Sequence, residues 1–169
     1  MSLARFISFF GLGACLVLLQ ACGGWTVSQL QSDLQPELAK IELPNPGTRL
    51  EQLVLQELNQ NILSNSDIKT YKLAFSVSAG GASTVAVRGT SSTLRTTTTT
   101  LTFTLVDKQT SETVLSDSLS ASASSGAVSG RYAQEKSTQF SNERLAKLLA
   151  DRLVQRLALF IANDKDERS

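Results

Sequence analysis

Residues 94–108 (LRTTTTTLTFTLVDK) combine a run of five threonines with alternating threonine and apolar residues at positions 100–105, and this pattern constrains the fold more than any other feature of the chain. Successive side chains of a β-strand point to opposite faces, so the apolar residues share one face and the later threonines share the other. The first set is Leu101, Phe103 and Leu105, and the second is Thr100, Thr102 and Thr104. Threonine is β-branched and suits a pleated surface. The segment predicts a long strand with one apolar face and one face of hydroxyls.

Further strands are predicted on both sides of this segment. The clearest is YKLAFSVSA, which alternates without interruption and is followed by Gly80 and Gly81, a turn or bulge signal. The polar residues 107–113 predict a hairpin turn, and residues 125–130 predict a flexible connection. The expected strands are residues 37–43, whose alternation is broken at Leu38 and Glu42, residues 71–79, residues 84–89 and residues 113–124.

The first predicted helix begins with a recognisable cap. Pro44, Pro46 and Gly47 end the preceding strand, and Thr48 with Glu51 three residues later matches a capping box. Apolar residues then recur at helical spacing, which predicts an amphipathic helix of about four turns. Its apolar face consists of Leu50, Leu53, Val54, Leu58 and Ile62.

A second amphipathic helix is predicted from about Tyr132 towards the C-terminus. Arg152 and Arg156 flank its apolar stripe and are expected to cover it with their aliphatic stems. The stripe consists of Leu145, Leu148, Leu149, Leu153, Leu157, Phe160 and Ile161.

The order of these elements predicts an α+β two-layer sandwich. Its sheet is expected to be antiparallel or mixed, with about four strands and the two amphipathic helices on one face. The threonine-rich face would then be left uncovered by the domain's own helices. An antiparallel sheet can show one face to water, and the alternative is that this face or a sheet edge meets a partner.

The N-terminal segment predicts export and lipidation. Arg5 precedes an uncharged run from Phe6 to Leu19, which is typical of a secretory signal and shorter than a spanning helix. Leu19, Gln20, Ala21 and Cys22 resemble a bacterial lipobox, in which the cysteine sulfur receives a diacylglyceryl group and the freed amine is acylated. Several acyl chains, such as palmitate, make a stable anchor. An ordinary signal peptide with a chance cysteine is the alternative.

These patterns divide the chain into four parts. We expect residues 1–21 to be a lipoprotein signal peptide, residues 22–36 a lipidated tether, residues 37–163 a single α+β domain and residues 164–169 a frayed tail. Gly23 follows Cys22 where an aspartate would favour retention in the inner membrane. We therefore expect a lipid-anchored protein on the periplasmic side of the outer membrane.

The composition argues against most catalytic chemistry. The chain has no histidine, which removes His-based triads and the commonest metal ligand. Asp107, Glu112 and Asp117 flank turn-like sequence and are expected to be solvated charges. We expect no enzyme activity, no metal and no cofactor. Removing Arg5 with the signal leaves 15 basic against 15 acidic residues, from 16 and 15 in the full chain, so no basic field favours nucleic acid.

Four stretches together resemble the LptE family of outer-membrane LPS-assembly lipoproteins, in its alphaproteobacterial-like form. They are CGGW after the lipobox, LPNPGTRLEQLVLQEL, the pair YKLAFSVS and TLTFTLVDKQTSETVLSDSLSASAS, and SGRYAQEKSTQFSNERLAKLLADRLVQRLALF. The last stretch carries the matching residues Tyr132, Ala133, Arg144, Leu149, Ala150, Asp151, Arg156 and Leu157. Two departures are Gly24 before the aromatic residue and the length of the threonine run.

The resemblance implies a non-enzymatic protein that plugs an LptD-like β-barrel, supports its assembly and helps deliver lipopolysaccharide to the outer leaflet. Lipopolysaccharide is anionic, so Arg88, Arg95 and Lys108 near the predicted sheet are candidate ligand-binding residues, with solubilising turn charges as the alternative. An auxiliary lipoprotein of an ABC-type envelope lipid transport system is the main competing function. A lipid carrier in the style of LolB would need more strands, and a periplasmic hydrolase would lack a histidine.

Overall fold

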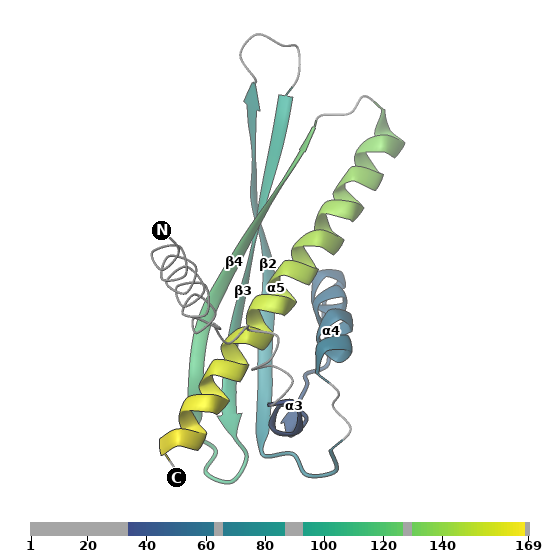
Figure 1. Ribbon diagram of the computed structural model, residues 1–169. Coiled ribbons are helices and arrows are strands. Elements are labelled where there is room, and N and C mark those ends of the chain that lie inside the picture. Colours follow the sequence, from purple (N-terminus) through teal and green to yellow (C-terminus); the bar gives the residue numbers. More distant parts are fainter. Residues whose placement is uncertain (1–33, 63–65, 87–92, 127–129, 168–169) are drawn as a thin grey trace, which may run out of the picture.

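The structure is a computed structural model that describes residues 34–62, 66–86, 93–126 and 130–167 (Figure 1). The predicted signal peptide, Cys22 and most of the tether lie outside these ranges, as does Arg88. Elements carry the labels of Figure 1. In the described residues, no helix is both long and apolar enough to cross a membrane.

Four strands form one sheet in the order β1-β2-β3-β4. The strand β1 pairs in parallel with β2, and the other pairs are antiparallel. The strands are β1 (Ile41–Glu42), β2 (Tyr71–Ala86), β3 (Thr93–Asp107) and β4 (Thr113–Gly126). With its helices on one face, this mixed sheet confirms the predicted α+β sandwich.

Among the residues that the structure describes, three helices accompany the sheet, namely α3 (Gln35–Leu38), α4 (Arg49–Asn61) and α5 (Arg131–Glu167). Figure 1 shows α5 crossing the sheet diagonally, with α4 beside it. At 37 residues α5 is about 55 Å long, which matches the length of the longest strands. Both long helices pack on the same face and form one core with the sheet.

A bulge interrupts the pairing of β2 with β3 between Ala79 and Ala82. A Cβ added at Gly80 would lie 2.9 Å from the carbonyl oxygen of Thr98, so a side chain does not fit there. The bulge prediction at Gly80 and Gly81 is confirmed, and the weaker strand expected at residues 84–89 continues β2 as far as Ala86.

The carboxylate of Glu51 joins the start of α4 to the edge of the sheet. Its Oε2 accepts hydrogen bonds from the backbone N–H of Gly47 at 2.8 Å and of Thr48 at 2.9 Å. The Thr48 hydroxyl in turn accepts from the Glu51 N–H at 3.3 Å, which confirms the predicted capping box. Oε1 accepts from the N–H of Val77 at 3.3 Å, on a part of β2 that lies beyond β1. One side chain therefore satisfies backbone donors in two layers.

We expect Glu51→Gln to make the stability of the fold less dependent on acid pH. The Gly47 N–H, followed by those of Thr48 and Val77, lowers the pKa of Glu51 below its ordinary value of 4.5. A lowered folded-state pKa stabilises the fold above about pH 4.5, and this contribution is lost as the pH falls through the folded-state value. Urea unfolding at several pH values checks this, and parallel pH profiles for the two proteins would contradict it.

The core lies between the sheet and the two long helices. Leu101, Phe103 and Leu105 are buried, as the alternation predicts, whereas Thr102 on the other face is exposed. The helix-facing residues are smaller in the row of Thr99 than in the rows of Leu101 and Phe103. Thr99 is flanked by Ala79 on β2 and by Ala121 on β4. The other fully buried large side chains are Leu38, Ile41, Leu58, Ile62, Leu73, Leu145, Leu149, Leu153 and Leu157.

Thr99 leaves a buried hydroxyl without a partner at the upper limit of the core. It is 1% exposed, and its Oγ1 makes no hydrogen bond in the described residues. We expect Thr99→Val, which replaces the hydroxyl by a methyl group of similar shape, to raise the free energy of unfolding by about 1 kcal/mol. Thr98→Val is the control, because the Thr98 hydroxyl is paired with Ser122. Denaturant unfolding measures both variants. An equal rise in the free energy of unfolding for both would contradict the idea that the unpaired hydroxyl of Thr99 destabilises the fold.

The strand expected at residues 37–43 is wrong in its first half. A helical turn, α3, occupies residues 35–38 and is followed by the two-residue strand β1. Pro36 suits the first turn of a helix, where its missing N–H has no intrahelical role. Leu34 and Leu38 lie four residues apart and are both buried, so ordered packing begins before the predicted domain start at residue 37.

The C-terminal helix differs from expectation in three places. It continues to Glu167, and Asp164 accepts a hydrogen bond from Tyr71 at 3.1 Å, so residues 164–167 are not frayed. Leu148, predicted in the apolar stripe, is 37% exposed because the buried side of α5 is centred one residue further round. Arg152 and Arg156 reach β4 with their guanidinium groups, where Arg152 donates to the Ser120 carbonyl.

Candidate functional site

The face of the sheet opposite the helices consists largely of serine and threonine. We call it the hydroxyl face. Its rows run across β2, β3 and β4, for example Ser76, Thr102 and Ser118. Its hydroxyl residues are Ser76, Ser78, Thr96, Thr98, Thr100, Thr102, Thr104, Ser116, Ser118, Ser120, Ser122 and Ser124.

The register between strands produces this face. Leu101 pairs with Val77 and Leu119, so the next residue on each strand points away from the core. Alternation within each strand and an unbroken register between β3 and β4 from Leu94 to Leu105 then align hydroxyl with hydroxyl. A shift of one residue would move the apolar set to the outer face.

Hydroxyls on neighbouring strands bond to one another. Thr96 lies 2.9 Å from Ser124, and Thr98 lies 2.9 Å from Ser122, with either oxygen able to donate. A shallow depression of about 290 Å³ lies further along, where Ala74 stands beside Ser76, Thr102 and Thr104. The surface is therefore polar, and its groups can donate or accept.

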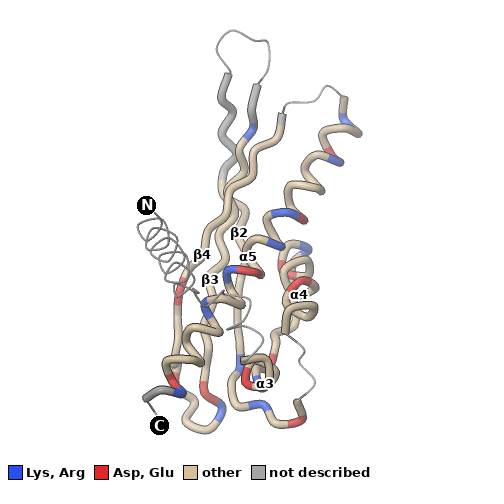
Figure 2. Tube along the Cα trace, viewed as in Figure 1, with Lys and Arg blue, Asp and Glu red and all other residues tan. Residues whose placement is uncertain are grey.

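Few charges interrupt the hydroxyl face. The described strands direct two charged side chains to this side of the sheet, namely Lys72 on β2 and its pairing partner Glu42 on the edge strand β1. Figure 2 shows Lys, Arg, Asp and Glu mostly along the helices and at the turns, while the strands are largely neutral. A partner that contacts this face would not have to desolvate a buried ion pair.

The single charged residue of β4, Asp117, points to the helix side. Asp117 pairs with Arg156 at 2.9 Å. The N–H of Ser118, followed by the Arg156 guanidinium, holds the pKa of Asp117 below its ordinary value. This pair fastens the lower part of β4 to α5 and does not reach the hydroxyl face.

The predicted ligand-binding residues do not form one site. Lys108 lies in the turn after β3 and donates to Glu42 at 2.7 Å, which lowers the pKa of Glu42. Arg95 is exposed near the other end of β3, on the order of 40 Å away along the strand. The prediction for Arg88 concerns a residue outside the described ranges.

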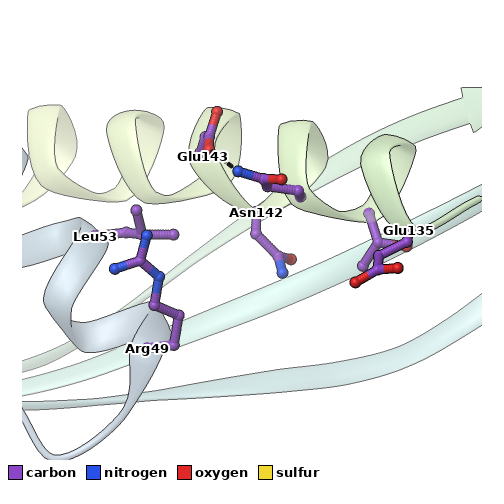
Figure 3. A pocket seen from close by; sticks show the side chains of 7 residues that line it. Arg49, Leu53, Glu135, Asn142 and Glu143 are labelled. Carbon is purple, nitrogen blue, oxygen red and sulfur yellow. Dashed lines mark hydrogen bonds between the residues drawn. The ribbon is translucent and has the colours of Figure 1, made fainter. Parts of the chain in front are cut away.

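Two grooves flank the upper half of α5. The first, of about 440 Å³, lies between α4 and α5 (Figure 3). Arg49 and Asn142 point into it from opposite helices, and acidic Glu135 and Glu143 lie along its α5 side. Gln139 donates to Glu143 at 3.0 Å. The mixed charges and the mutual hydrogen bond make this groove a weak candidate for a specific ligand.

The second groove, of about 500 Å³, lies between α5 and the end of β4. Lys136, Phe140 and Arg144 line it from the helix, and Phe140 is 67% exposed. Sequence reasoning missed these residues. A signal was present, because Tyr132, Lys136, Phe140 and Arg144 follow one another at intervals of four and alternate aromatic with basic. That interval places them along one side of a helix.

Comparison with known proteins gives a fold but no family. No family model matches the chain, and no curated protein sequence matches it. A solved protein assigned as a lipoprotein from Caulobacter crescentus CB15 aligns with a TM-score of 0.64 and 18% identity over 78% of this chain and 97% of that one. A minor lipoprotein from Acinetobacter baumannii aligns with a TM-score of 0.50 and 20% identity over 70% of this chain and 90% of that one.

Proposed function

We propose that this chain is a lipid-anchored outer-membrane lipoprotein that plugs and supports an LptD-like β-barrel and helps deliver lipopolysaccharide. The observation that carries the proposal is the hydroxyl face, a polar surface with few charges across three strands that no described helix covers. A surface of this kind can face water, and where it meets a partner it suits a polar wall. The lumen of an outer-membrane barrel is polar and offers such a wall.

The energetics of hydroxyl groups favour such a contact. Serine and threonine both donate and accept, so they can pair with varied polar groups. Burying them in a lumen avoids the desolvation penalty that buried charges incur. The fold adds support, since both solved proteins described above are assigned as lipoproteins.

The anchor in this proposal is Cys22. We expect Cys22→Ala to abolish incorporation of radiolabelled palmitate and to release the protein from the membrane fraction, because acyl chains supply the attachment. Metabolic labelling followed by fractionation checks this. Cys15→Ala is the matched control, since that cysteine precedes the expected cleavage point and should leave labelling unchanged. Labelled Cys22→Ala protein would contradict the proposal.

Lipopolysaccharide would meet basic residues at the upper end of the sheet. Arg95 is exposed there, and Arg88 stays a candidate from the sequence because it lies outside the described residues. Lys108 already pairs with Glu42 at the other end, so we place it outside this contact. The proposal assigns no catalytic role to any residue.

The decisive experiment is a pull-down of the C-terminally tagged full chain from detergent-solubilised envelopes, followed by mass spectrometry. A stoichiometric partner of large barrel size that resists high salt is expected, because a contact through hydroxyls is little screened. An inner-membrane transporter in its place would favour the auxiliary ABC-transport function. Recovery of no partner would overturn the barrel proposal.

A further inference from the structure

The groove between β4 and the upper half of α5 lies beside an open edge of the sheet. Its strand side consists of residues 123–125, and no residue of β3 lines it. β4 is the last strand in the sheet order, so no described strand pairs with its outer edge. Figure 1 shows the ends of β4 and α5 diverging towards the connection between them.

The backbone of β4 presents hydrogen-bonding groups along this edge. The Ser120 carbonyl accepts from Arg152 on α5 and therefore points away from β3. In an antiparallel strand the N–H and C=O groups reverse direction at each residue and so repeat every second residue. Ser122 and Ser124 therefore direct these groups to the same open side as Ser120. Arg152 and Arg156 bond to Ser120 and Asp117 on the lower part of β4, and neither has a hydrogen bond to a residue of β4 after Ser120.

This part of β4 lacks the features that usually protect an edge strand. Residues 118–126 read SLSASASSG and contain no proline and no charged side chain. Exposed edges without such protection accept further strands readily. The small side chains also leave room beside the edge for an incoming segment.

The helix wall of the groove has one sign of charge. Lys136 and Arg144 line it, and none of its lining residues is acidic. The acidic residues of the same helical stretch, Glu135 and Glu143, face the other groove in Figure 3. Phe140 lies between the two basic residues in sequence and is largely exposed. The ammonium of Lys136 lies 5.9 Å from the centre of the Tyr132 ring.

We propose that β4 accepts an extended, acidic segment of a partner protein as an added antiparallel or parallel strand, seated between residues 121–126 and α5. Backbone hydrogen bonds to Ser122 and Ser124 would hold the segment. Its acidic side chains would meet Lys136 and Arg144, and an apolar side chain would cover Phe140. A second copy of this chain fits less well, because two such edges would bring two basic walls together.

The proposal concerns the backbone edge of β4 and the groove on the helix side, whereas the hydroxyl face consists of side chains on the other side of the sheet. Ser122 and Ser124 contribute to both, the edge through their backbone and the face through their hydroxyls. Failure of strand addition would leave the barrel proposal untouched, and loss of the barrel partner would leave this edge available. The two are told apart because the pull-down uses envelopes, while the test below uses the purified chain and a synthetic probe.

The probe is a fluorescent peptide of about ten residues that alternates valine with aspartate, titrated into the purified chain and followed by anisotropy. Saturable binding is expected. The double variant Lys136→Glu with Arg144→Glu should weaken it about tenfold or more, because both charge contacts become repulsive. Ser124→Pro should weaken it similarly, since proline removes the outward N–H and leaves the β3 side of the ladder intact.

Three controls make the outcomes decisive. Glu135→Gln, on the other side of α5, should leave binding unchanged, and a valine–lysine peptide should not bind. Circular dichroism should show each variant folded, and Phe140→Ala offers a further weakened variant that leaves charge and backbone alone. Binding that Ser124→Pro does not weaken would overturn strand addition. Absence of peptide binding would overturn the proposal. If the chain then bound anionic vesicles in a Lys136-dependent manner, the groove would be assigned to lipid headgroups.

Discussion

Phe103→Ala is expected to lower the free energy of unfolding by about 3–5 kcal/mol. Phe103 is 1% exposed at the centre of β3, where it pairs with Phe75 on one side and Asp117 on the other. Removing its ring deletes buried apolar surface and leaves a cavity that the long strands cannot easily close. Since folded domains are stable by only about 5–15 kcal/mol, this loss brings the chain near unfolding.

The matched control for that change is Phe140→Ala. It removes the same atoms from a side chain that is 67% exposed, and substitutions at such surface positions usually change stability by less than about 0.5 kcal/mol. Urea unfolding followed by circular dichroism measures both variants under one condition. Similar losses for the two would contradict the assignment of the core to the helix-facing side of β3.

Thr102→Glu is expected to abolish recovery of the barrel partner while the chain itself stays folded. Thr102 is exposed at the middle of the hydroxyl face, in the row with Ser76 and Ser118. A carboxylate buried there against a polar wall would lose its hydration without a cationic partner, which is costly. The pull-down from envelopes, repeated with this variant, measures the loss.

Two controls accompany this prediction. Thr102→Ser keeps a hydroxyl at the same place and should retain the partner. Gln52→Glu adds the same charge on the exposed side of α4 and should also retain it. If Thr102→Glu recovers as much partner as the wild-type chain does, the hydroxyl face is not the contact surface.

Local patterns predicted the elements whose cause is local. The alternation at residues 71–79 and 100–105 predicted the two central strands with their correct faces, because side-chain direction in a strand has a period of two. The capping box at Thr48 and Glu51 is formed by residues three apart, so its motif is complete in the sequence. The bulge at Gly80 also follows from a residue type.

Elements that depend on contacts with residues far away in the sequence were predicted wrongly or missed. The helical turn α3 forms where Leu34 and Leu38 are buried, and burial depends on the partners that cover them. Residues 164–167 stay helical in a structure where Asp164 bonds to Tyr71, 93 positions earlier.

The sequence by itself determined which side chains share a face, where the long helices lie and that one sheet face carries hydroxyls. These properties follow from steric preferences that act over a few residues. The tertiary structure alone decided that Thr98 meets Ser122, that Glu51 reaches Val77, and that α5 leaves a groove beside β4. Each of these depends on the register and the packing of segments far apart in the chain, which the side chains of no single segment can specify.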